Sequence, residues 1–129
     1  MMLCGVDIVA VERIKKAVSG ENGTRFKTRI FTQREIDYCE SKANDKHNGM
    51  YQSYAARFAA KEAFSKALGK GLGASVNVSD IEIKNDLLGK PRIEICGQTR
   101  ELFDGMGCLN IELSISHETD YAVAFVIIY

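Results

Sequence analysis

The chain has 129 residues, of which 46% are hydrophobic and 26% charged, so it is long enough and apolar enough to fold around a core. This composition argues against disorder, and no apolar run is long enough to span a membrane. Asp7 interrupts the apolar N-terminus and no basic segment precedes it, so we see no signal peptide and expect a cytoplasmic protein without membrane association.

The first half of the chain predicts one strand followed by helices. The strand is expected at residues 2–9, and the helices at 11–18, 25–31, 32–42 and 51–68. The helix at 32–42 begins with a capping box, in which the Thr32 hydroxyl accepts from the Glu35 amide and the Glu35 side chain reaches back. The last of these helices is the longest, and Gly69 ends it, with Gly71 following.

The second half predicts strands and one short helix. Strands are expected at residues 76–84, 92–96, 109–117 and 121–129, and the helix at 98–103. Leu109 is the first of the apolar residues on one face of the third of these strands, and residues 118–120 join it to the last strand as a hairpin. Because helices and strands occupy separate parts of the chain, we expect an α+β fold, in a single domain over residues 1–129.

The four cysteines are expected to be free thiols. They form no C-x-x-C pair, and the chain has only two histidines, so the sequence does not favour a zinc site. Cys4 and Cys96 stand in apolar strand patterns, which predicts that both are small core residues.

Positive charge is concentrated in one part of a chain whose net charge is zero. Residues 13–34, here called the basic stretch, hold seven Lys and Arg against Glu21 alone, a net charge of +6 that leaves −6 for the rest. A polarised surface attracts an acidic partner, although a merely solvated helix face is the commoner explanation of such a run. Nucleic acid is not expected as a partner, because the chain as a whole is not basic.

Two carboxylates stand in apolar surroundings far apart in the chain. Asp7 interrupts the first strand, and Glu62 lies in the middle of the Ala-rich helix. A carboxylate near a core is usually paired, hydrogen-bonded or bound to metal. Two carboxylates that converge form a hard-oxygen site, the kind that holds Mg²⁺ against a phosphate.

Lys66 and the end of the chain supply further candidates. Lys66 follows Glu62 by four residues and shares its helix face, so both could point into one cleft or form an exposed ion pair. The glycines after this helix let backbone approach a ligand closely. Ser116 and His117 end a strand and suit phosphate or hydroxyl recognition, although an exposed polar face is an equal alternative.

These segments together resemble the 4′-phosphopantetheinyl transferases, and more narrowly the short bacterial holo-acyl-carrier-protein synthase type. The residues that carry the resemblance are Gly5–Val9 (GVDIV), Arg57–Gly69 (RFAAKEAFSKALG), Ser114–His117 (SISH), Arg29–Thr32, Gly89–Pro91 and the apolar last strand. Lys70 is a departure, since a small or hydroxyl residue is expected between the two glycines.

The resemblance implies a compact domain in which a mainly antiparallel sheet packs against a long helix. It implies transfer of 4′-phosphopantetheine from coenzyme A to a serine of apo acyl carrier protein, which activates the carrier for fatty acid synthesis. Asp7 and Glu62 would bind Mg²⁺, and Glu62, Asp7 and Lys66 would be catalytic. Coenzyme A would contact residues at several places in the chain, namely Lys66, Gly69, Gly71, Pro91, Ser116 and His117.

The family's compact members are homotrimers with active sites between subunits, which implies the same here. The basic stretch would dock the acidic carrier through Arg13, Lys16, Arg25 and Arg29. Glu62 is the first candidate for the base that takes the serine proton, and His117 the second. Two other interpretations remain open, a non-catalytic module that docks an acidic partner and a nucleotide-binding hydrolase that uses the same carboxylates.

Overall fold

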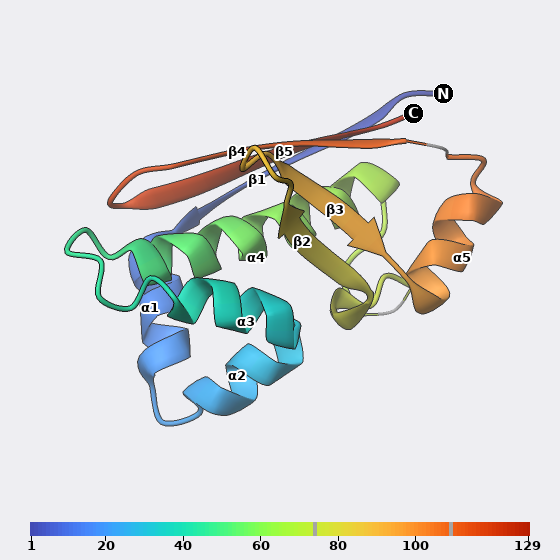
Figure 1. Cartoon of the computed structure of the whole chain (residues 1–129). Helices are drawn as coiled ribbons and strands as arrows, with labels where there is room; N and C mark the ends of the chain where they lie inside the picture. Colours follow the sequence, from blue (N-terminus) through green and yellow to red (C-terminus); the bar gives the residue numbers. More distant parts are fainter. Residues whose placement is uncertain (74, 109) are drawn as a thin grey trace.

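The computed structural model describes residues 1–73, 75–108 and 110–129 (Figure 1). Its elements are, in chain order, β1 (Leu3–Ala10), α1 (Val11–Ser19), α2 (Gly23–Ile30), α3 (Gln33–Glu40), α4 (Gly49–Leu68), the 3₁₀ turn η1 (Val78–Asp80), β2 (Ile81–Asn85), β3 (Pro91–Ile95), α5 (Gly97–Gly105), β4 (Ile111–His117) and β5 (Tyr121–Ile128). Every predicted helix and strand is present, and the capping box that opens α3 is confirmed.

One boundary differs substantially from the prediction. The strand expected from Val76 begins only at Ile81, because η1 occupies the residues before it. The side chain of Asn77 starts this turn by accepting a 3.2 Å hydrogen bond from the Ser79 amide. Leu109, the expected start of another strand, lies outside the described residues, and β4 begins at Ile111.

The fold consists of an antiparallel sheet packed on the long helix α4, as predicted. The sheet has the strand order β1-β5-β4, and a separate hairpin pairs β2 with β3. Figure 1 shows α4 running between the three-stranded sheet and the group formed by α1, α2 and α3. Most of α4 is therefore buried, which explains why its sequence is rich in alanine.

Strand β1 and helix α4 approach backbone to backbone. A Cβ atom at Gly5 would collide with the carbonyl oxygen of Ala63 and lie 2.6 Å from the amide nitrogen of Ala67. Both alanines are buried, so small side chains on both elements permit the contact. This close approach joins the strand that carries Asp7 to the helix that carries Glu62.

The outer face of the sheet, which α4 does not cover, is apolar. We define this outer face by Cys4, Val6, Ile8, Val123, Phe125 and Ile127, which share one side of β1 and β5. The core prediction for Cys4 was wrong, because even-numbered residues of β1 point outward. The core prediction for Cys96 was also wrong, because this residue is exposed where β3 ends. Cys39 and Cys108 are the buried cysteines.

All four cysteines are free thiols, as expected. Among the residues described, none of the helices combines the length and the apolar character that crossing a membrane requires.

Candidate active site

The structure brings Asp7, Glu62 and Lys66 together where β1 crosses α4. The ammonium of Lys66 donates to Oδ1 of Asp7 at 2.9 Å and to the Val6 carbonyl at 3.1 Å. Only 15% of the Asp7 side chain is exposed, so its carboxylate faces the helix and not the solvent. The expected convergence of these residues is confirmed, but Lys66 bonds to the strand and not to its helical neighbour Glu62.

The electrostatic surroundings of Glu62 disfavour its ionised form. Partial burial, and then the negative charge of Asp7, raise the pKa of Glu62 above its ordinary value, while Lys66 and Arg13 oppose the shift. Two neighbouring carboxylates repel one another when both are ionised. A cation placed between them would remove this repulsion, and the Lys66 ammonium already neutralises part of it.

A pocket of about 350 Å³ opens beside Glu62. We call it the Glu62 pocket, and its walls include Arg29, Ile30, Phe58, Leu72 and Val78. Its lining combines apolar side chains with one carboxylate and one guanidinium, as expected of a site that holds a small ligand in a fixed orientation.

The glycine-rich turn connects Lys66 with the Glu62 pocket. Gly69 ends α4 in the left-handed conformation (φ 73°), and its amide donates to the Lys66 carbonyl at 3.0 Å. Gly71 is exposed, with open space where a side chain would be, and Leu72 follows it into the pocket wall. The predicted glycines therefore lie next to Lys66, where backbone is accessible to a ligand.

A second pocket, of about 180 Å³, lies beside the end of β4. This His117 pocket is lined by His117 and Pro91, both predicted from the sequence, and by Ser53 and Arg57 of α4. Nδ1 of His117 lies 2.8 Å from Oε1 of Gln52. The amide nitrogen of Gln52 donates to the His47 carbonyl at 2.6 Å, so Oε1 accepts from Nδ1 and leaves Nε2 of His117 as the ring atom available to a ligand.

Arg57 is a candidate residue that the sequence reasoning missed. It is 5% exposed, its guanidinium lies 4.0 Å from the centre of the Tyr38 ring, and its Nε atom has no hydrogen-bond partner among the described residues. A buried guanidinium with an unused donor beside a pocket favours an anionic ligand. The signal was present, since Arg57 is a charged residue within an Ala-rich segment of the helix.

The predicted coenzyme A contacts fall on opposite sides of α4. Ser53, in the His117 pocket, and Glu62 are nine residues apart, about two and a half turns at 3.6 residues per turn, so they point in opposite directions. Ser116 lies in neither pocket, because it shares the outward side of the sheet with its register partner Val123. One chain therefore does not gather the predicted contacts into one cleft.

The predicted docking residues lie on α1 and α2, near Glu62. Arg13, Lys16, Arg25 and Arg29 are all exposed. Arg13 stacks over the Phe58 ring, 5.4 Å from its centre, and its positive charge opposes the rise in the pKa of Glu62. Arg29 lines both the Glu62 pocket and a shallow hollow beside Arg25 on α2, so the basic surface continues into the pocket.

The chain matches the model of the 4′-phosphopantetheinyl transferase superfamily (ACPS) over residues 3–126. The chain belongs to this superfamily. The holo-[acyl-carrier-protein] synthase of Ruminiclostridium cellulolyticum is 51% identical over 128 residues, covering 98% of this chain and 91% of that protein. The synthase of Geotalea daltonii is 48% identical over 124 residues, covering 96% and 94%.

Solved structures of such synthases share the fold. The Helicobacter pylori enzyme in complex with coenzyme A superimposes with a TM-score of 0.83 at 33% identity, covering 98% of this chain and all of that one. The Bacillus anthracis enzyme in complex with coenzyme A (3′,5′-ADP) gives a TM-score of 0.78 at 34% identity, covering 99% and 97%. The α+β transferase fold is thereby confirmed.

Proposed function

We propose that this phosphopantetheinyl transferase is a holo-[acyl-carrier-protein] synthase. It transfers the 4′-phosphopantetheine group of coenzyme A to a serine of apo acyl carrier protein and releases 3′,5′-ADP. The observation that carries the proposal is the convergence of Asp7, Glu62 and Lys66, in a chain about half identical to a synthase of this kind. We further propose that residues 1–129 act as one domain, in the cytoplasm, where they activate the carrier for fatty acid synthesis.

Asp7 and Glu62 are the residues that would hold Mg²⁺. The described residues contain no cluster of three or more His, Cys, Asp or Glu side chains, but Mg²⁺ commonly binds to one or two carboxylates and keeps water and substrate phosphates as its other ligands. The fit is supported by the Lys66 ammonium, a cation that is already paired with Asp7. It is also supported by burial and by the charge of Asp7, which raise the pKa of Glu62 and which a cation would offset. The chemistry that the metal supplies is neutralisation of negative charge on the pyrophosphate.

Glu62 is also our candidate for the base that removes the proton of the carrier serine. Its carboxylate lines the same pocket as Arg29 of the docking surface, so a serine delivered there would lie beside a group that can accept its proton. His117 is the weaker candidate, because it lines the other pocket and suits contact with a phosphate or ribose.

Coenzyme A binding needs two copies of the chain in this proposal. Lys66, Gly69 and Gly71 would bind the pyrophosphate near the metal, while Pro91, Ser116 and His117 of a neighbouring copy would bind the rest of the nucleotide. The buried guanidinium of Arg57 gives the His117 pocket a natural attraction for a phosphate. This division accounts for the placement of the predicted contacts on opposite sides of α4.

The outer face of the sheet supports assembly into a homotrimer. Val6 and Phe125 are register partners and remain 54% and 42% exposed, and Ile8 beside them is 65% exposed. A contiguous apolar surface of this kind marks an interaction site in most proteins. Self-association through it would bury these side chains and bring the two kinds of pocket from different copies together.

The acidic carrier would dock on the basic stretch, through Arg13, Lys16, Arg25 and Arg29. Because Arg29 lines the Glu62 pocket, a carrier bound on α2 would present its serine close to Glu62. Positioning and charge neutralisation, which are the main requirements of phosphoryl-type transfer, would then be met at one place.

Intact-mass spectrometry of a carrier protein tests the proposal. The purified chain is incubated with apo acyl carrier protein, coenzyme A and Mg²⁺, and the carrier is weighed. We expect the carrier to gain one phosphopantetheine group. A carrier of unchanged mass that still binds the chain would indicate a docking module, whereas hydrolysed coenzyme A without carrier modification would indicate a hydrolase.

A further inference from the structure

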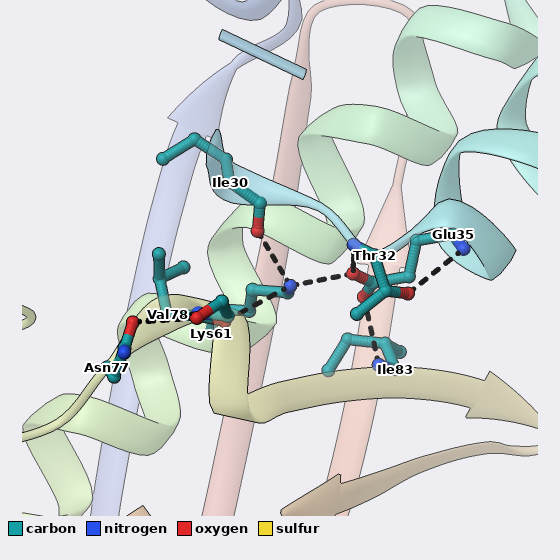
Figure 2. A network of polar contacts seen from close by, with 8 residues as sticks. Ile30, Thr32, Glu35, Lys61, Asn77, Val78 and Ile83 are labelled. Carbon is teal, nitrogen blue, oxygen red and sulfur yellow. Dashed lines mark hydrogen bonds and ion pairs between the residues drawn. The ribbon is translucent and has the colours of Figure 1, made fainter. Parts of the chain in front are cut away.

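Lys61, the residue directly before Glu62, carries a buried positive charge that the reaction described above does not use. It is 1% exposed, and its ammonium donates to Oε1 of Glu35 at 2.6 Å (Figure 2). The same nitrogen donates to the carbonyls of Ile30 at 2.8 Å and Val78 at 3.5 Å. An ammonium has three hydrogens, so these contacts use its full donor capacity.

Glu35 extends the network to two further segments. Its Oε1 also accepts from the Thr32 amide at 2.8 Å, and its Oε2 accepts from the Ile83 amide at 2.9 Å, as Figure 2 shows. One ion pair therefore connects α4 to the end of α2, the start of α3, η1 and β2. These segments come from three separate parts of the sequence, near residues 30–35, 61 and 78–83, and the ion pair joins them.

The two residues whose backbone carbonyls accept from Lys61 belong to the walls of the Glu62 pocket. Ile30 and Val78 both line that pocket, and Glu62 follows Lys61 in the chain. Ile30 is also the last residue of α2, directly after Arg29, so the carbonyl that Lys61 holds anchors the helix of the docking surface. A single nitrogen therefore donates hydrogen bonds to two segments, the end of α2 and η1, that lie beside Glu62.

Stability alone does not account for a charged pair at this place. Burial lowers the pKa of Lys61, and the charge of Glu35 opposes that shift, so the two charges mainly offset each other's desolvation. Replacing a buried ion pair by apolar side chains of similar volume is often neutral or stabilising. Apolar side chains would, however, hold neither carbonyl at a fixed distance.

We propose that Lys61 is a positioning residue for the transfer reaction, which with Glu35 as its counter-ion holds α2 and η1 at fixed distances from Glu62. This role rests on the proposed function, because it matters only if a carrier docked on α2 delivers its serine to Glu62. Loss of the pair would leave both substrates bound but misaligned. A displacement of about 1 Å costs a reaction of this kind roughly a hundredfold in rate.

The test is the double variant Lys61→Met/Glu35→Gln, which removes the charges together and keeps the side-chain volumes. We expect a cooperative thermal transition, a dissociation constant for coenzyme A within about twofold of wild type, and kcat at saturating carrier lower by about tenfold to a hundredfold. The matched control is Tyr54→Phe, which removes a partly buried 2.9 Å hydrogen bond from α4 to Glu40 without touching the pocket walls. Tyr54→Phe should be less stable than wild type but should have an unchanged kcat.

A double variant whose kcat falls less than about tenfold, or falls only together with its affinity for coenzyme A, overturns the positioning role. If the double variant does not fold, Lys61→Arg replaces it, because a planar guanidinium keeps the charge but cannot hold three acceptors around one nitrogen. The same fall in kcat is then expected, and an unchanged kcat again overturns the role. A wild-type chain that does not modify the carrier would instead refute the proposed function.

Discussion

The ammonium of Lys66 lies 2.9 Å from Oδ1 of Asp7, a residue 59 positions away in the chain. In the absence of a metal this cation compensates the carboxylate that would bind Mg²⁺. The two cations would compete for Asp7, so Mg²⁺ binding would release Lys66 toward a phosphate. An ammonium, which acts as a point charge, suits such an exchange of partners.

Lys66→Ala should therefore weaken coenzyme A binding more than carrier binding. We expect the dissociation constant for coenzyme A to rise by about tenfold, equivalent to about 1.4 kcal/mol, and Lys66→Arg to restore part of the loss. Isothermal titration with coenzyme A measures this. Arg100→Ala is the control, since Arg100 is an exposed cation on α5, and equal affinities in the two alanine variants would remove Lys66 from the site.

Asp7→Ala should abolish transfer while the chain still folds. The strand keeps its pairing, because the register partner of Asp7 is Ala124 and the bonds between them are backbone bonds. We expect a loss of at least a hundredfold in kcat/KM, about 2.7 kcal/mol at 1.36 kcal/mol per tenfold. Intact-mass assays at several Mg²⁺ concentrations check this, and near-normal turnover at low Mg²⁺ would exclude Asp7 as a metal ligand.

Glu62→Gln should stabilise the metal-free chain at neutral pH. Because burial and Asp7 raise the pKa of Glu62, the folded chain holds this proton more tightly than the unfolded chain does. The stability that Glu62 contributes is complete below its ordinary pKa of 4.5 and is lost as pH rises through the raised pKa. Thermal melts should show the variant above wild type at pH 7.5 and the two converging near pH 4, whereas a constant difference would contradict the raised pKa.

Addition of Mg²⁺ should make wild type melt at a higher temperature than Glu62→Gln. A ligand present at a hundred times its dissociation constant stabilises the folded state by about 2.7 kcal/mol, and wild type alone would keep both carboxylates to bind it. Glu101→Gln serves as the control, because Glu101 is exposed on α5. A wild-type melting temperature that Mg²⁺ does not move would argue against the metal site.

The sequence predicted local relationships well and distant ones poorly. The capping box of Thr32 and Glu35 depends on residues three apart, and it is present as predicted. The second role of Glu35, as the counter-ion of Lys61, joins residues 26 apart and has no local pattern. Lys66 is a second example. Helical spacing suggested Glu62 as its partner, but the packing of β1 on α4 places Asp7 beside it. The possibility that Asp7 and Glu62 converge came from their apolar surroundings, and the resemblance to a family then assigned both to one metal.

Charge reversal on the basic stretch should selectively weaken binding of the carrier. We expect Arg13→Glu and Arg25→Glu to raise the KM for carrier by about tenfold and to leave coenzyme A affinity unchanged, because attraction between opposite surfaces aids encounter. The wild-type KM for carrier should rise with salt, which screens charges over roughly 8–10 Å, and the variants should respond less. Arg100→Glu on the distant α5 is the control, and selective effects there would place the docking surface elsewhere.

Phe125→Asp should dissociate the assembly and stop transfer. Phe125 lies at the centre of the outer face, opposite Val6, and a carboxylate there would be costly to bury between subunits. Light scattering should show a monomer in place of a trimer, and the intact-mass assay should show an unmodified carrier. Gln98→Asp, at an exposed position on α5, controls for added negative charge, and an active monomer would show that one chain suffices.

The contact of Gly5 with Ala63 and Ala67 has a practical consequence for engineering. It sets the separation of the two carboxylate-bearing elements by main-chain geometry. Stabilising substitutions could be introduced around Phe64 and Phe103, whose rings stack at 6.5 Å, as long as they leave this contact unchanged. Even one added methyl group at position 5 would push β1 from α4 and separate Asp7 from Glu62, which makes this glycine the residue that such a redesign has to leave unchanged.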